Sequence, residues 1–519
     1  MRAVESALER YAETDRTLVR ILDGAGGFAA EYTYRQITRA ARALSDELAP
    51  LVTAGGRTGV LCGNTAEFVV ADLALLAARA TEVPVPLAFT REQAASLLEE
   101  AEVCVVDSLG AARLAEWGRE GVLPPGCRVV EVSPDALAAD APLGAAAQPY
   151  AVPAADENWI CKIIHTSGTT SRPKGVRIRS GGIGALIDSL HAAMPADAFA
   201  RYLSVVPFSL LIEQVTGLYL VLLDGGCVTL LPPDAPLVGT SGSAVEATLP
   251  HLVTARTTAV VATPALVTAL AEAAHRAKEA GGDVNQALFG TDRAPLICCG
   301  GAPVHPDTLR ELDGFGIPVY EGYGLSENSS VVSWNTPGAR RIGTVGRPLR
   351  HVSVRLSEEG EVLVSSPSLF DGYTRPDPSA CAVVDGWLHT GDLATIDEDG
   401  FLRITGRKKN VIITAAGRNV APEWVEAQYA RLPFVRAAAV VGNDLPALNG
   451  LFVIDPAVDP QEAEREIAAF GAEHLSQVER VEVVHLLSAD DEAYRRLFTV
   501  TGRPVRTAIA ESLLSHQPR

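Results

Sequence analysis

The stretch that decides the fold of this chain is His165-Thr166-Ser167-Gly168-Thr169-Thr170-Ser171-Arg172-Pro173-Lys174-Gly175. It follows a mostly apolar run, residues 159–164, which predicts a strand. Small residues let the backbone bend tightly and bring its N–H groups close to an anion, while the hydroxyl groups and Lys174 add donors and positive charge. The stretch therefore predicts a loop that binds a triphosphate. It is not the GxxxxGK[ST] loop, because no Gly-Lys-Ser/Thr closes it; taken alone, a polar surface loop explains it equally well.

Three later segments change that balance. They are Tyr323-Gly324-Leu325-Ser326-Glu327, Thr390-Gly391-Asp392 and Gly406-Arg407-Lys408-Lys409-Asn410. Together with the loop they resemble the adenylate-forming superfamily, which contains acyl-CoA synthetases, aryl-CoA ligases, luciferases and nonribosomal adenylation domains. The segments occur in the family's order from Thr166 to about Arg506, so the resemblance spans most of the chain. It implies an ATP-dependent enzyme that activates an acid.

Composition narrows the class of protein. Hydrophobic residues make up 47% of the 519 residues, enough for a large folded core. The net charge of −19 disfavours binding to nucleic acid. The eight cysteines form no CxxC pair and no zinc-ligand spacing, which predicts a reducing, cytoplasmic location. The most apolar stretch, residues 202–223, is interrupted by Pro207, Glu213 and Gln214, so it predicts a buried element and no transmembrane segment.

The order of predicted elements gives an α/β fold. Helical and strand-like segments alternate to about residue 330, which favours mixed β-sheets covered by helices. Residues 343–370 are β-rich and contain a hairpin pattern. A new α+β pattern begins after Arg407. We therefore expect a large N-terminal domain, residues 1–407, with a β-rich subdomain, and a small C-terminal domain, residues 408–519. The resemblance implies that the small domain is mobile and acts as a lid.

The resemblance also implies which residues bind the nucleotide. The implied contacts are Thr166, Ser167, Gly168, Thr169, Thr170 and Lys174 in the loop, Gly300, Gly301, Ala302 and Pro303 in a glycine-rich turn, Glu321, Gly322, Tyr323, Gly324 and Ser326, and then Asp392, Arg407 and Lys409. Asp392 would bind both ribose hydroxyls, for which a carboxylate is the natural bidentate acceptor. Lys409 would be the pivot of the C-terminal domain. Asn410 replaces an Asp that is common in relatives.

Carboxylates are the expected ligands of Mg²⁺, a cation that prefers oxygen. The resemblance places Glu327 and Glu213 at this metal and Thr166, Glu327, Lys174 and Arg503 in the catalytic step. The alternative for Glu327 is a solvated acid in a loop. A buried Glu213 would be costly unless it were paired or bound to metal.

Residues 206–213 resemble the family segment that lines the acid pocket. The implied pocket residues are Leu210, Leu211, Cys299 and Gly301. Relatives often carry His or an aromatic residue at the position of Leu210, so its aliphatic side chain favours an apolar acid.

The largest departure from the family pattern lies near the C-terminus. The segment Thr499-Val500-Thr501-Gly502-Arg503-Pro504-Val505-Arg506 resembles Thr-x-x-Gly-Lys-x-x-Arg, with Arg503 where relatives carry the catalytic lysine. Arginine keeps the positive charge but presents a planar fork in place of a compact ammonium group. Four explanations stay open: Arg503 substitutes for lysine, adenylation runs slowly without lysine, another substrate has changed the requirement, or the chain is a nucleotide-binding pseudoenzyme.

The function expected from the sequence is formation of acyl-AMP and pyrophosphate from an acid and ATP, with Mg²⁺. Transfer to a thiol of CoA or of a phosphopantetheinyl carrier protein would follow, because residues 415–422 resemble the loop that approaches pantetheine. The alternatives are coupling to an amine and activation of a small anion such as nitrite, as in diazo-forming relatives.

Overall fold

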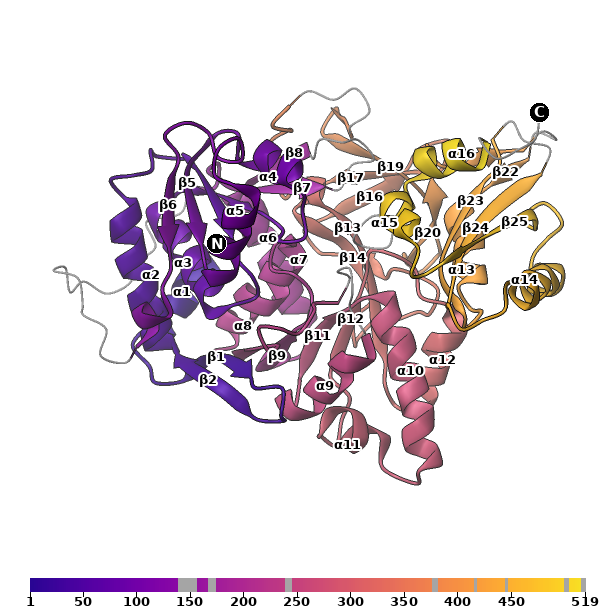
Figure 1. The fold of residues 1–519 in the computed structure, drawn as a ribbon. Coiled ribbons are helices and arrows are strands. Elements are labelled where there is room, and N and C mark those ends of the chain that lie inside the picture. The colour runs from indigo at the N-terminus through magenta and orange to yellow at the C-terminus, as the bar shows by residue number, and fades with distance from the viewer. Residues whose placement is uncertain are drawn as a thin grey trace.

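The computed structural model describes residues 1–138, 156–166, 174–238, 245–375, 381–414, 418–443, 447–498 and 504–514. Figure 1 shows a large N-terminal part, indigo to orange, and a small C-terminal unit in orange and yellow beside it. The predicted α/β fold class is confirmed.

The first sheet carries the predicted triphosphate loop at its edge. Its strands run in the order β6-β5-β3-β4-β7-β8 and pair in parallel except for the β7–β8 hairpin. The strands are β3 (Arg57–Leu61), β4 (Thr81–Pro84), β5 (Ala101–Val106), β6 (Arg128–Glu131), β7 (Ile160–Thr166) and β8 (Lys174–Arg179). The helices of this region are α2 (Tyr34–Leu48), α3 (Ala66–Ala78), α4 (Arg91–Leu98), α5 (Ser108–Trp117), η1 (Pro134–Leu137) and α6 (Ser180–Ala193).

The second sheet carries the remaining central motifs. Its order is β15-β14-β13-β12-β11-β9-β10-β1-β2, parallel from β13 to β1 and antiparallel at both ends. The strands are β1 (Thr17–Leu22), β2 (Phe28–Thr33), β9 (Arg201–Ser204), β10 (Cys227–Leu230), β11 (Ala259–Ala262), β12 (Leu296–Cys299), β13 (Val319–Leu325), β14 (Ser330–Trp334) and β15 (Arg347–Pro348). Its helices are α1 (Arg2–Tyr11), α7 (Leu211–Gln214), the π-helix η2 (Val215–Tyr219), α8 (Leu220–Leu223), η3 (Val245–Thr248), α9 (Leu249–Ala255), α10 (Pro264–Glu279), α11 (Val284–Phe289), α12 (Pro306–Gly314) and η4 (Ser326–Asn328).

The β-rich subdomain is an antiparallel sheet, as the hairpin pattern predicted. Its strands are β16 (Ser353–Leu356), β17 (Glu361–Ser365), β18 (Val383–Val384), β19 (Trp387–Ile396) and β20 (Leu402–Arg407). The last strand leads directly into the C-terminal unit.

The C-terminal unit has hydrophobic clusters of its own on both faces of one sheet. Successive side chains of a strand point to opposite faces, and Leu451 and Val453 join one cluster while Phe452 and Ile454 join the other. This sheet consists of β23 (Val435–Val441), β24 (Leu448–Ile454) and β25 (Val481–Ser488), and β21 (Ile412–Ile413) pairs separately with β22 (Asn419–Val420). The helices of the unit are α13 (Pro422–Tyr429), α14 (Pro460–His474), α15 (Glu492–Leu497) and α16 (Arg506–Leu514). Separate cores agree with the predicted boundary at residues 407 and 408, which stays a prediction.

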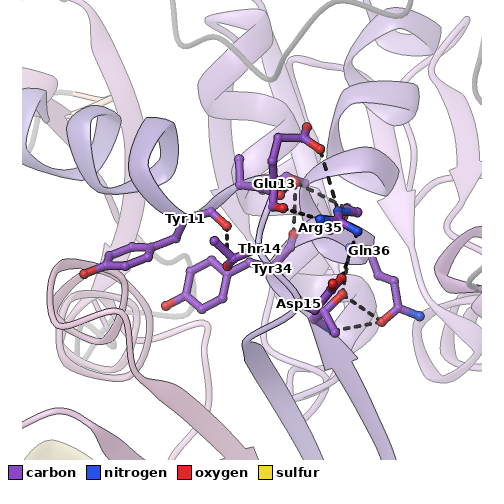
Figure 2. A network of polar contacts seen from close by, with 10 residues as sticks. Tyr11, Glu13, Thr14, Asp15, Tyr34, Arg35 and Gln36 are labelled. Carbon is purple, nitrogen blue, oxygen red and sulfur yellow. Dashed lines mark hydrogen bonds and ion pairs between the residues drawn. The ribbon is translucent and has the colours of Figure 1, made fainter.

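A polar network joins the loop after α1 to the start of α2 (Figure 2). Arg35, at the start of α2, donates to the backbone oxygen of Glu13 and pairs with Asp15 at 2.9 Å. The neighbouring Tyr34 hydroxyl donates to the Gly226 carbonyl oxygen at 2.9 Å, next to β10. The loop between α1 and β1 is thereby held against α2.

The apolar stretch from 202 to 223 is a buried element, as predicted, and runs through β9, α7, η2 and α8. Across the described ranges of the chain, no helix combines the length and apolar character needed to cross a membrane. The cellular location stays a prediction.

Candidate active site

The predicted triphosphate loop joins two antiparallel strands. Thr166 ends β7, Lys174 begins β8, and the two residues are register partners, so both flank the loop on the same sheet edge. Ser167, Gly168, Thr169 and Thr170 lie outside the described residues, as do the side chains of Thr166 and Lys174. Their phosphate contacts stay predictions.

Asp392 is the centre of the described site. It lies in β19 opposite Arg407 in β20, and the Arg407 Nε donates to Asp392 Oδ1 at 2.7 Å. The Tyr323 hydroxyl, from β13, donates to the other oxygen at 2.6 Å. Three signature segments far apart in the sequence therefore meet at one carboxylate, which is only 3% exposed.

The groups in contact with Asp392 are a guanidinium and a phenol, and both donate to it. Burial opposes the charge of Arg407, but the adjacent carboxylate wins and raises the Arg407 pKa above its ordinary value. Burial, reinforced by Asp392, raises the pKa of Tyr323, so this hydroxyl stays a donor. A fixed carboxylate acceptor suits a pair of ribose hydroxyls.

Glu327 lies at the tip of the β13–β14 hairpin and is 8% exposed. The Tyr373 hydroxyl donates to Glu327 Oε1 at 2.7 Å, and the Cys381 backbone N–H donates to that hydroxyl at 3.2 Å. The Cys381 thiol contacts the Thr390 carbonyl oxygen at 3.6 Å, two residues from Asp392. Glu327 is thus an oriented acid and differs from a solvated loop residue.

Cys381 and Tyr373 are site residues that the sequence reasoning missed. Cys381 lies within the electrostatic reach of Glu327, Asp392 and Arg407, and burial followed by Glu327 raises the pKa of its thiol to about 11. The thiol is therefore protonated and unreactive at neutral pH. No motif marks either residue, because their partners are remote in sequence.

The hairpin that carries Glu327 has a constrained backbone. A Cβ on Gly324 would lie 1.7 Å from the Ser330 carbonyl oxygen, so only glycine fits there. Ser329 and Ser330 have φ of 52° and 105°, a region that non-glycine residues rarely adopt. Such backbone is costly and persists where the surroundings enforce it, as at functional sites.

The glycine-rich turn, residues 300–303, follows β12. A Cβ on Gly300 would meet the Gly322 carbonyl oxygen at 3.2 Å, so the turn lies close against β13. The Glu321 carboxylate accepts from the Val304 N–H at 3.1 Å, and burial raises the Glu321 pKa to about 7. Glu321 thus holds the turn in place, two residues before Tyr323, which donates to Asp392.

Glu213 is fully buried in α7, behind the predicted acid pocket. The Tyr202 hydroxyl donates to its Oε2 at 2.7 Å and the Ser204 hydroxyl to its Oε1 at 2.6 Å. Burial raises the pKa of Glu213 to about 8, so it is mostly protonated at neutral pH. This state suits the hydroxyl network better than a metal ion, and the role of Glu213 at Mg²⁺ stays a prediction.

The predicted pocket residues separate by exposure. Leu210 is 38% exposed at the start of α7 and Gly301 is exposed, whereas Leu211 and Cys299 are buried. Leu210 and Gly301 are therefore the predicted pocket residues that could contact an acid directly.

The predicted pivot joins the two units. Lys409 is exposed, and each of its two neighbours contacts a different unit. Lys408 pairs with Glu359 of the N-terminal part at 2.5 Å. Asn410 Nδ2 donates to Glu423 Oε1 of α13, in the C-terminal unit, at 2.6 Å. An ionised aspartate could not donate this hydrogen bond, so the contact with Glu423 gives a physical reason for asparagine at position 410.

Arg503 itself lies outside the described residues, but both flanks of its segment are fixed. Phe498 and Pro504 form a β-bridge. Arg506 donates to both oxygens of Glu426, at 2.5 and 2.8 Å, and burial raises the Glu426 pKa to about 7 against the effect of Arg506. The segment therefore starts and ends at defined places on the C-terminal unit.

Residues 7–374 match the family model described as AMP-binding enzyme. The chain belongs to this family. Its members are ATP-dependent, AMP-forming acid ligases, so the predicted superfamily and enzyme class are confirmed.

Individual relatives span most of the chain. The long-chain-fatty-acid–CoA ligase FadD15 of Mycobacterium bovis is 32% identical over 459 residues, covering 78% of this chain and 74% of that protein. The amide bond synthetase McbA from Marinactinospora thermotolerans is 27% identical, with a TM-score of 0.75 over 98% of this chain and 99% of the other. The anthranilate CoA ligase AuaEII, solved with anthranoyl-AMP, has a TM-score of 0.78 over 99% and 98% at 20% identity, which shows the shared fold.

The described residues fit a magnesium nucleotide. Asp392 and Glu327 are carboxylates oriented by tyrosine hydroxyls, and Cys381 connects their surroundings. Within the described ranges no group of three or more His, Cys, Asp or Glu side chains forms a metal site. A Mg²⁺ ion bound together with substrate phosphates typically takes one or two carboxylates and keeps several waters.

We expect Asp392→Ala to weaken ATP binding by about 1.5–3 kcal/mol, because a hydrogen-bonded charged acceptor is lost. Isothermal titration calorimetry measures this directly. Asp397→Ala is the control, since Asp397 lies just beyond β19 and pairs with Arg341 at the surface. Unchanged affinity in Asp392→Ala, or an equal loss in the control, would refute the ribose assignment.

We expect the difference in melting temperature, Glu213→Gln minus wild type, to become more positive as the pH increases from 6 to 8.5. A raised folded-state pKa means that the native protein loses stability as pH rises from the ordinary value of 4.5 through about 8. Gln mimics the protonated acid and avoids this loss, which is on the order of 2 kcal/mol between pH 6 and pH 8.5. A constant difference between the proteins, or weaker magnesium-dependent ATP binding in the variant, would contradict the protonated state.

Proposed function

We propose that this chain activates an apolar carboxylic acid as acyl-AMP and then transfers the acyl group to the thiol of CoA. The observation that carries the proposal is the convergence of Tyr323 and Arg407 on the buried carboxylate of Asp392. Glu327 lies near this cluster, with the bridging contacts of Tyr373 and Cys381. The arrangement supports a nucleotide held at its ribose and at its phosphates.

In the first step a carboxylate oxygen of the acid attacks the α-phosphorus, and the bond from that phosphorus to the bridging oxygen breaks. Pyrophosphate leaves with the electron pair, and acyl-AMP remains. Asp392 would hold the ribose, Thr166 and Lys174 the outer phosphates, and Glu327 the magnesium ion. When bound, Mg²⁺ neutralises phosphate charge. Arg503 would stabilise the negative charge that develops at the α-phosphate.

In the second step a thiolate attacks the acyl carbonyl carbon. The carbon–oxygen bond to the phosphate breaks, and AMP leaves with one oxygen of the acid. Arg418 is exposed on the β21–β22 hairpin, where a cation would favour an acceptor that carries phosphate groups, such as CoA or a phosphopantetheinyl carrier protein. Residues 415–417 of this loop lie outside the described residues.

Leu210 and one named relative both favour an apolar acid as the substrate. An exposed leucine at the start of α7 offers apolar contact and no charge partner for a second polar group of the substrate. FadD15 is named a long-chain-fatty-acid–CoA ligase. An aliphatic or other apolar acid is the substrate class that both favour.

Coupling to an amine is the second candidate function. The amide bond synthetase McbA resembles this chain over nearly the whole length of both proteins at 27% identity. An amine would attack the same acyl-AMP, so the two functions share the first step and differ only in the acceptor.

The proposal is tested by incubating the protein with MgATP and a panel of acids, each with CoA, a carrier protein, simple amines or no acceptor. Mass spectrometry of the products identifies the acyl group and its acceptor, and nitrite is included as an acid. We expect an acyl-CoA from an apolar acid. Amides without acyl-CoA would establish the second candidate, and ATP binding with no product from any acid would establish a pseudoenzyme.

The proposed mobility of residues 408–519 about Lys409 gives one prediction. Lys409→Pro fixes φ at the pivot, so we expect one half-reaction to slow at least about tenfold more than the other, since each needs a different domain orientation. Single-turnover rates of acyl-AMP formation and of transfer from added acyl-AMP measure both. Lys408→Pro is unsuitable as a control because Lys408 N–H donates to the Gly391 carbonyl oxygen; Lys409→Ala serves instead. Equal slowing of both steps would argue against a pivot.

A further prediction concerns Arg503. Arg503→Ala should slow acyl-AMP formation by about 10²–10³, the usual effect of losing one preorganised group at developing charge. Transfer from preformed acyl-AMP should remain within a few-fold. Arg503→Lys is the matched control and should retain adenylation, because it restores a compact cation. If Arg503→Ala adenylates at the wild-type rate, Arg503 does not act in this step.

A further inference from the structure

A buried charge cluster is connected to residues 206–210, the first part of the predicted pocket-lining stretch 206–213, and this part is called the acid-pocket segment below. Lys162 of β7 pairs with Asp72 of α3 at 2.7 Å and contacts the carboxylate of Glu82 in β4. The three side chains are 1%, 0% and 2% exposed. Burial raises the pKa of Glu82, and Lys162 opposes this effect. A fully buried ion cluster of this kind is costly to form and is weak evidence for a stabilising role.

Gln214 connects this cluster to the acid-pocket segment. Its Nε2 has two hydrogens, one of which is donated to Glu82 Oε1 at 3.0 Å and the other to the Phe208 carbonyl oxygen at 2.7 Å. The other side of the segment is held by Asn64, which donates to the Val206 carbonyl oxygen at 2.7 Å and accepts from the Phe208 N–H at 2.9 Å. The backbone before Leu210 is therefore fixed from two directions.

The π-helix η2 gives this region its shape. Gln214 and Tyr219 are five residues apart, which would separate them by about 140° around a regular α-helix. The wider i→i+5 turn, closed by the bond from the Leu220 N–H to the Val215 carbonyl oxygen, brings them nearer to one face. Tyr219 then donates to Asp72, at 2.8 and 3.0 Å, while Gln214 reaches Glu82.

We infer that the contacts Lys162–Glu82–Gln214 set the position of the acid-pocket segment relative to β7, the strand that ends at Thr166 and leads into the triphosphate loop. This inference rests on the proposed function, because it assumes that the acid lies against Leu210. Lys162 is four residues before Thr166 on a rigid strand. A carboxylate must approach the α-phosphate within a narrow geometry, and misplacement by about 1 Å can cost 10²-fold in rate. Gln214 is therefore a positioning residue that acts through the Phe208 backbone.

The test compares two variants that each remove one neutral donor from the same cluster. Gln214→Met removes the bonds to Glu82 and Phe208 with little change of shape. Tyr219→Phe removes only the bond to Asp72, which keeps Lys162. Acid-dependent exchange of labelled pyrophosphate into ATP gives the KM for acid, the KM for ATP and kcat for each protein, and thermal melting gives the stability of each.

We expect Gln214→Met to lower kcat/KM for the acid at least about tenfold, while its KM for ATP stays within twofold of the wild type. Tyr219→Phe should lower the melting temperature without changing either KM by more than twofold. Gln214→Glu, protonated in this setting, should restore part of the acid kcat/KM. Asn64→Ala, at the opposite anchor, should shift the acid parameters in the same direction and serves if Gln214→Met fails to fold.

The outcomes separate the two proposals. Absence of exchange in the wild type with every acid would overturn the proposed function. Exchange in the wild type with equal acid kcat/KM in Gln214→Met and Tyr219→Phe would overturn the positioning role alone. A parallel loss of acid and ATP parameters in Gln214→Met would assign Gln214 to stability and also overturn it.

Discussion

The hydrogen-bonded ion pair of Asp392 and Arg407 is the interaction on which the rest of the site depends. The two residues face each other on adjacent strands, and Tyr323 reaches them from the second sheet. Arg407 is also the last residue before the turn that leads into the C-terminal unit. The acceptor proposed for the ribose and the base of the mobile unit are therefore built from the same pair of strands. A nucleotide at Asp392 would lie next to the pivot.

Several buried acids in this protein accept a hydrogen bond from a tyrosine hydroxyl. Tyr323 donates to Asp392, Tyr373 to Glu327, Tyr202 to Glu213 and Tyr219 to Asp72. A phenol orients a carboxylate and lowers its desolvation cost without adding a second charge. The acids differ in what else surrounds them: Asp392 also pairs with Arg407, whereas the described partners of Glu213 are hydroxyl donors and burial raises its pKa to about 8. This difference separates an acceptor for ligand from a structural acid.

Sequence patterns predicted the parts of the fold that depend on local periodicity. The alternation of helices and strands to about residue 330, the hairpin of β16 and β17 and the α+β pattern after Arg407 all occur as expected. The order of the signature segments identified the family, but it could not show that Asp392 and Arg407 are register partners. Contacts of Tyr373 and Cys381 were missed because they join segments with no shared motif.

The buried cluster of Lys162, Glu82 and Asp72 was also invisible in the sequence, for a physical reason. A single charged residue in a strand pattern usually faces water, and only the packing of α3 against β4 and β7 reveals that all three are enclosed. The π-turn at Val215–Tyr219 has no sequence signature either. Arg503 and residues 167–170 lie outside the described residues, so their roles rest on the family pattern and on chemistry.

The measurement that tests the central claim most directly is the fate of an isotope label. An apolar acid carrying ¹⁸O in both carboxylate oxygens is converted with MgATP and CoA, and the AMP, pyrophosphate and any ADP or phosphate are analysed by mass spectrometry. If the acid attacks the α-phosphorus, AMP carries one ¹⁸O and pyrophosphate carries none. Label in phosphate together with ADP, or unlabelled AMP, would contradict an acyl-AMP intermediate and with it the assignment of Asp392, Arg407 and Glu327 to acid adenylation.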